Sequence, residues 1–104
     1  MLARMWGGKT RKIHAEEYLD YLKKTGLKEY ASTPGNRGVR VLRRLREDQV
    51  EFLLISMWDS LDSIRAFAGP EPDRACYYPE DDRYLLEKTE MVDHFEIVFD
   101  SDEG

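Results

Sequence analysis

The spacing of apolar residues changes several times along the chain, and these changes predict the order of its elements. An apolar-rich segment from Met1 to Trp6 predicts a strand that ends at Gly7-Gly8. A helix is expected next, with Thr10 as its N-cap and Gly26 as its end, because apolar residues recur there at helical spacing. These residues are Ile13, Tyr18, Leu19, Tyr21 and Leu22. A second, short helix is expected at 27–31.

The middle of the chain carries the clearest strand signals. Turn-forming residues at 34–38 precede a predicted strand at 39–46, and a turn at 47–49 leads into a strand at 50–58 that is rich in β-formers. A helix is expected at 61–68, capped by Asp59 or Ser60 and ended by Gly69-Pro70.

Pro72 and Pro79 then interrupt the chain. Short helices are predicted at 73–76 and 80–87, and a last strand at 91–99. The resulting order, β-α-β-β-α-β, is typical of the α+β ferredoxin-like fold, an antiparallel sheet with helices on one face. We expect one domain, 1–99, and a frayed polar tail, 100–104.

The strand at 50–58 is apolar on both faces. Helices cover only one face of such a sheet, so a second copy of the chain is expected to cover the other, as a homodimer with sheets packed face to face. One apolar set is Val50, Phe52, Leu54 and Trp58, and the other is Leu53, Ile55 and Met57.

Charge is divided unevenly along the chain. Residues 1–52 contain 12 Lys/Arg and 7 Asp/Glu, net +5, whereas residues 53–104 contain 4 and 14, net -10. Pairing of the halves within or between subunits explains this pattern. An overall charge of -5, without aromatic residues among the arginines at 40–46, argues against a nucleic-acid partner. The longest apolar stretch, 52–58, is too short to span a membrane.

Few side chains are available for metal or nucleophilic chemistry. Cys76 is the single cysteine and is expected to be a small buried residue, and His14 and His94 are the two histidines, at no spacing that metal sites use. Glycine-rich phosphate loops are also missing from the sequence. We therefore expect no metal and no cofactor. No signal peptide is visible, so the cytoplasm is the expected location.

His94 is the strongest candidate for acid–base chemistry. It shares a face of the last predicted strand with Glu96, and the first and last strands of a ferredoxin-like sheet are neighbours, so Arg4 is expected to reach one of the two. Such a cluster supplies a general base, or else a structural ion pair at a subunit interface. The pattern leaves both interpretations open.

Aromatic residues with polar tips form a second candidate group. Trp6, Trp58, Tyr77 and Tyr78 suit the wall of a pocket for a flat ligand, with Asn36 and Arg37 as polar partners. The same aromatic residues also suit an ordinary core.

Several stretches resemble the antibiotic biosynthesis monooxygenases, a family of dimeric α+β-barrel proteins. They are residues 35–38, 56–61, 64–69, 75–82 and 92–96, and Phe67-Ala68-Gly69 and Tyr77-Tyr78-Pro79-Glu80-Asp81 are the most specific parts. The resemblance implies oxidation of a phenolic or hydroquinone-like substrate by O₂ without a cofactor. On that basis we expect His94 to be the base, Arg37 and Asn36 to hold an oxyanion, and the four aromatic residues to bind the rings.

Two alternatives stay open. One is a non-catalytic small-molecule-binding or assembly module of the same fold, because no strong catalytic signature is present. The other is a haem-binding or haem-degrading protein, since the superfamily also includes such proteins.

Overall fold

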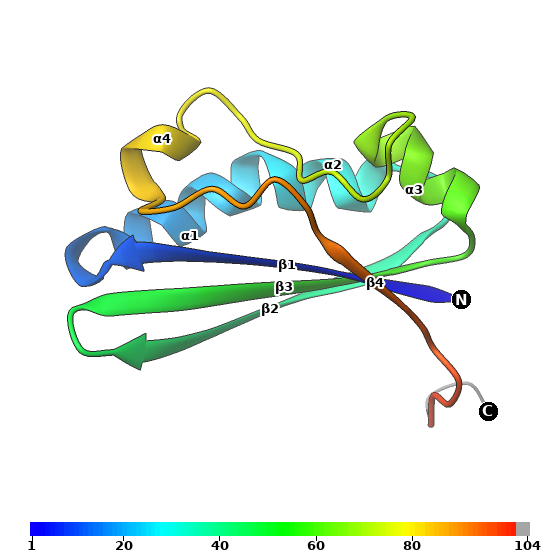
Figure 1. Cartoon of the computed structure of the whole chain (residues 1–104), viewed down its shortest axis with the longest axis horizontal. Coiled ribbons are helices and arrows are strands. Elements are labelled where there is room, and N and C mark those ends of the chain that lie inside the picture. Colours follow the sequence, from blue (N-terminus) through cyan, green and yellow to red (C-terminus); the bar gives the residue numbers. More distant parts are fainter. Residues whose placement is uncertain (102–104) are drawn as a thin grey trace.

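Four antiparallel strands form one sheet, in the order β2-β3-β1-β4, within residues 1–101, which the computed structural model describes (Figure 1). The strands are β1 (Leu2–Arg11), β2 (Asn36–Arg46), β3 (Gln49–Trp58) and β4 (Asp93–Glu96). The predicted neighbours, the first and last strands, do pair, with Arg4 opposite His94. The α+β ferredoxin-like fold is therefore confirmed. Most of the predicted polar tail, residues 102–104, lies outside the described residues.

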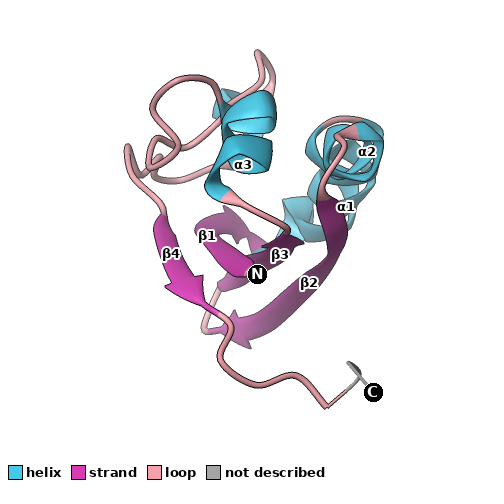
Figure 2. Ribbon diagram, turned by 90° about the vertical axis from the view of Figure 1, so that its right-hand side faces the viewer, coloured by secondary structure: helices cyan, strands magenta, loops and turns pink. Residues whose placement is uncertain are grey.

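The helices all lie on one face of this sheet (Figures 1 and 2). They are the short 3-10 helix η1 (Lys12–His14), α1 (Ala15–Lys24), α2 (Gly26–Ser32), α3 (Leu61–Ala68) and the single turn α4 (Asp81–Tyr84). The main core fills the space between the two layers, where Tyr18, Phe52, Trp58 and Ile64 are almost fully buried. None of these helices is long and apolar enough to cross a membrane.

The first strand does not end at Gly7-Gly8 as predicted, but continues to Arg11. Gly8 lies within the strand, and the indole ring of Trp6 lies over it. The residue is a glycine because a Cβ at this position would come within 2.5 Å of that ring. Gly8 therefore permits the close approach of the Trp6 ring to the backbone and does not end the strand. Thr10 is consequently a buried strand residue instead of a helix cap, and α1 begins only at Ala15.

The predictions differ in accuracy after β3. The helix at 61–68 is confirmed, and its cap is Ser60, whose side chain accepts a hydrogen bond from the backbone amide of Ser63. The predicted helix at 73–76 is wrong: that segment consists of turns and an isolated bridge between Arg74 and Met91. The prediction at 80–87 holds only for the turn at 81–84, and the last strand is limited to 93–96.

The sheet face opposite the helices carries a second apolar set, as the sequence predicts. Leu42 and Phe95 are 45% and 55% exposed there, next to the half-buried Leu53, Ile55 and Met57. We call this surface the open face. That a second copy covers it stays a prediction.

Candidate functional site

A small cavity lies between the helices and the sheet. Its volume is about 30 Å³, room for one or two water molecules. Side chains from β1, β3, α1, α2, α3 and the segment before α4 surround it. The lining residues are Arg4, Trp6, Tyr18, Leu22, Gly26, Tyr30, Leu54, Phe67, Cys76, Tyr78 and Asp81. We call this space the inner cavity.

Arg4 places a positive charge in this cavity wall. The residue is 2% exposed, and its guanidinium donates to the carbonyl oxygen of Arg74 at 2.8 Å and more weakly to the Tyr30 hydroxyl at 3.5 Å. It also lies 5.5 Å from the ring centre of Phe67. The Nε atom is buried without a hydrogen-bond partner. Because buried polar groups are nearly always satisfied, an unpaired donor on a charged group marks an unusual place.

His94 lies opposite Arg4 on the neighbouring strand and faces the helix layer. Its side chain is 13% exposed, and its Nδ1 atom is 2.9 Å from Oδ1 of Asp73. Its Nε2 atom is buried without a partner. In the tautomer with the hydrogen on Nδ1, this atom donates a hydrogen bond to the Asp73 carboxylate and Nε2 is an acceptor.

The acidic partner of His94 is Asp73 and not Glu96, the residue that the sequence predicts. Glu96 is exposed and lies opposite Leu2, so it does not form the expected cluster with Arg4 and His94. Asp73 takes its place, from the segment that was predicted to be helical. That segment is fixed beside β4 because the Val92 amide donates to the Asp73 carbonyl. No spacing in the sequence signals this contact, which joins two irregular segments.

Two of the four predicted aromatic residues, Trp6 and Tyr78, line the inner cavity, and Tyr77 contacts Trp6 edge-on. The indole nitrogen of Trp6 donates to the Tyr77 hydroxyl at 3.3 Å, and that hydroxyl donates to the Thr89 carbonyl. The Tyr78 hydroxyl donates to Glu29 at 2.6 Å. Trp58 lies deeper, against Phe67, and is completely buried.

Burial raises the pKa of several ionisable groups that line the inner cavity. Burial raises the pKa of the Cys76 thiol, and Arg4 offsets part of this effect. Burial, followed by the nearby Glu29 carboxylate, raises the pKa of Tyr78. Burial also raises the pKa of Asp81, whose carboxylate accepts a hydrogen bond from the Tyr78 amide. Because the Cys76 thiol and the Tyr78 phenol keep their protons, neither gives Arg4 a neighbouring negative charge.

Asn36 and Arg37 do not approach His94. They lie at the start of β2, whereas His94 is on β4, at the opposite edge of the sheet, about 14 Å away at the usual strand spacing. Arg37 pairs with Asp59 at 2.5 Å, and Asn36 hydrogen-bonds the Met57 carbonyl and the Gly38 amide beside a bulge in β2. We therefore leave both residues out of the candidate site.

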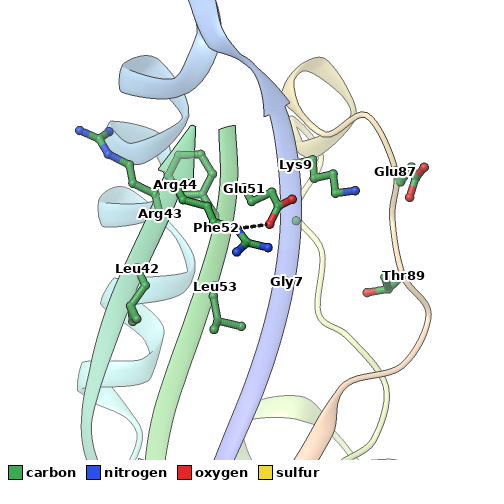
Figure 3. A pocket seen from close by; sticks show the side chains of 11 residues that line it. Gly7, Lys9, Leu42, Arg43, Arg44, Glu51, Phe52, Leu53, Glu87 and Thr89 are labelled. Carbon is green, nitrogen blue, oxygen red and sulfur yellow. Dashed lines mark hydrogen bonds and ion pairs between the residues drawn. The ribbon is translucent and has the colours of Figure 1, made fainter. Parts of the chain in front are cut away.

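A larger hollow of about 610 Å³ lies on the open face, between the strands and the segment at 87–89 (Figure 3). Its floor contains Leu42, Leu53 and Gly7, and its charged groups include Lys9 and an ion pair of 2.8 Å between Arg44 and Glu51. The polar atoms here are exposed or paired. We place the candidate site at the inner cavity, because Arg4, whose Nε is buried without a partner, lines it, and His94 lies beside Arg4 on the neighbouring strand.

Within residues 1–101, no group of three or more His, Cys, Asp or Glu side chains is arranged to hold a metal ion.

Comparison with known proteins supports the fold. No family model and no curated protein matches this chain. Among solved structures it is similar to one described as a mutant of MhuD with two manganese protoporphyrin IX molecules bound per active site. The two chains are 18% identical, with a TM-score of 0.59, over 96% of this chain and 97% of that one. At this identity the likeness shows a common fold.

Proposed function

We propose that this protein binds a weakly acidic aromatic molecule between the helices and the sheet, and that His94 takes its proton. The pair formed by Asp73 and His94 carries this proposal, because Asp73 contacts Nδ1 and leaves Nε2 buried without a hydrogen-bond partner. Trp6 and Tyr78 supply aromatic surface with polar tips, and Tyr77 holds the Trp6 indole by a hydrogen bond. At about 30 Å³ the inner cavity has no room for a ring as it stands, so binding of a ring requires its walls to move apart.

Deprotonation of such a molecule permits oxidation by O₂ without a cofactor. The carbanion or phenolate form transfers one electron to O₂, and the two radicals combine to a peroxide anion. This anion takes back the proton that His94 had removed and becomes a hydroperoxide. Loss of water then gives a carbonyl group. For a methylene compound the balance is R₂CH₂ + O₂ → R₂CO + H₂O. The protein supplies orientation, a base and a positive charge near the anion.

Oxygen uptake with anthrone, in the presence of a metal chelator, tests this reaction. The His94→Ala variant is expected to lose most of the rate, on the order of 10²-fold or more. His14→Ala is the matched control, because His14 lies in η1 and outside the inner cavity. Asp73→Asn is expected to lower the rate less than His94→Ala. Equal rates in wild type and His94→Ala would remove His94 from the mechanism.

The nearly filled interior favours a second candidate, a non-catalytic binding module. In that case anthrone or a related phenol binds, shown by a change in tryptophan fluorescence, but oxygen is not consumed. The similar structure with bound manganese porphyrin motivates one further control, a haemin titration. The inner cavity as it stands does not fit a porphyrin, so we derive no step through haem.

We also propose that a second copy of the chain covers the open face. The face carries Leu42, Leu53, Ile55, Met57 and Phe95, and burial of such a surface is favourable. Light scattering at micromolar concentration tests it, and the mass of a single chain would contradict it.

A further inference from the structure

Arg4 differs from the surface arginines of this protein in its burial and in its hydrogen-bond partners. Those at 37, 43, 44, 65, 74 and 83 are each paired with a carboxylate and largely exposed. Arg4 is 2% exposed, and its hydrogen bonds go to one carbonyl and one hydroxyl. Among residues 1–101, no carboxylate forms an ion pair with it. A buried charge without a counter-ion is costly to keep.

The acidic groups closest to the inner cavity already serve other partners. Asp81 accepts the amide of Tyr78, and Glu29 accepts its hydroxyl. A guanidinium has five N–H donors, of which Arg4 uses two in these hydrogen bonds. Its Nε is among the donors left over, and it is buried. The folded protein therefore holds a desolvated cation with spare donors beside a small cavity.

We propose that Arg4 is the binding site for the anionic oxygen of an aromatic ligand, a carboxylate or an ionised phenol. This inference rests on the ligand site proposed above and names its ligand class. A planar guanidinium donates two N–H groups either to the two oxygens of a carboxylate or to the single oxygen of a phenolate. The cavity has room for such an oxygen group. Trp6 and Phe67 line the same space, so they would contact an attached ring once the walls have moved apart to admit it. His94, on the adjacent strand, removes the proton of a phenol, and Arg4 holds the resulting charge.

Titration with benzoate and with benzamide, followed by tryptophan fluorescence and by melting temperature, tests the proposal. The two probes have similar size and differ in charge. Benzoate is expected to bind and to raise the melting temperature, and benzamide to do neither at the same concentration. Arg4→Met removes the charge with little change in length, and is expected to weaken benzoate binding at least about tenfold. Arg65→Met, on the exposed side of α3, is the matched control and is expected to bind like wild type.

The outcomes separate this inference from the proposed reaction. Benzoate binding that depends on Arg4, without oxygen uptake from anthrone, supports the anion site and rejects the oxidation. Oxygen uptake that is unchanged in Arg4→Met supports the oxidation and overturns the anion site. Equal binding of benzoate and benzamide, or none of either, also overturns it. Unfolding of Arg4→Met is checked by circular dichroism, and Arg4→Lys then replaces it, since a lysine keeps the charge but not the paired donors and is expected to bind benzoate more weakly than wild type.

Discussion

The two faces of the sheet offer contrasting hollows. The open-face hollow is about 610 Å³, and its arginine, Arg44, is exposed and paired with Glu51. The inner cavity is about 30 Å³, and its arginine is buried without a carboxylate. The larger hollow therefore lies on the open face, whereas the buried group with unused hydrogen-bonding capacity lies on the helix side.

This difference indicates separate roles for the two faces. A wide, partly apolar surface with satisfied charges suits contact with a second protein surface. A small cavity lined by a buried cation without a carboxylate partner, with a histidine on the neighbouring strand, suits a small polar ligand. Pairs of matched substitutions, one on the helix side and one elsewhere, test this separation.

The largest difference is expected between two consecutive residues of β3. Phe52 is 2% exposed and packs edge-on against Tyr18, whereas Leu53 points to the open face. Phe52→Ala is expected to lower the free energy of unfolding by about 3–5 kcal/mol, because it leaves a cavity in the core. Leu53→Ala is expected to cost clearly less when a dilute, monomeric sample is measured by urea denaturation. Equal losses would contradict the distinction between the faces.

The next prediction concerns two leucines of β2. Leu42 lies opposite Leu53 on the open face, and Leu45 lies opposite Val50 on the helix side, near the end of the strand, where it is 57% exposed. Leu42→Asp is expected to weaken self-association by about 10²-fold, because it buries a charge at the contact. Leu45→Asp leaves association unchanged. Sedimentation at several concentrations measures both, and association that survives Leu42→Asp would argue against the open face as the interface.

A smaller effect is expected at the two glycines of β1. A Cβ on Gly8 meets the Trp6 ring at 2.5 Å, whereas the nearest atom to a Cβ on Gly7 is a backbone oxygen at 3.8 Å. Gly8→Ala is expected to lower stability by about 1–3 kcal/mol through overpacking. Gly7→Ala is expected to be neutral or slightly stabilising, since alanine restricts the unfolded chain. Thermal unfolding compares the two, and a tolerated Gly8→Ala would show that Trp6 is not held in place.

The smallest effect concerns the pH dependence of stability at Asp81. Burial raises the pKa of this carboxyl in the folded state, so the folded protein binds more protons than the unfolded chain above the usual Asp pKa. Stability from this group is thus present at low pH and is lost as the pH rises through its folded pKa. Asp81→Asn is expected to reduce that decline at pH values above the usual Asp pKa. Asp62→Asn, at an exposed site paired with Arg65, serves as the control. Melting temperatures at several pH values would contradict the account if both variants behaved alike.

The sequence was most informative where a pattern repeats within one element. The alternation in β3 and the apolar spacing of 61–68, with its serine cap, predicted those elements almost to the residue. Gly7-Gly8 was misleading, because only the tertiary position of the Trp6 ring explains the glycine at 8. The segment at 73–76 was also misassigned, since its conformation is set by contacts with residues 90–92.

The candidate site was predicted only in part, for the same reason. The fold alone brings Arg4 next to His94, and that neighbourhood follows from strand order. The pairing of His94 with Asp73 joins two irregular segments, and the burial of Arg4 depends on α2, α3 and the segment at 74–78 together. Neither leaves a periodic trace in the sequence. Asn36 and Arg37 were chosen for their chemistry, and they lie at the other edge of the sheet.

The most direct test of the central claim is the nuclear magnetic resonance signal of the arginine Nε–H groups during titration with benzoate. The account predicts a saturable shift of the Arg4 signal, whose Nε is buried and unpaired, and no change at Arg44, whose Nε donates to Glu51. Benzamide leaves both signals in place. A signal of Arg4 that does not respond to benzoate, or one that moves no more than that of Arg44, would contradict the claim that the helix side of the sheet holds the ligand site.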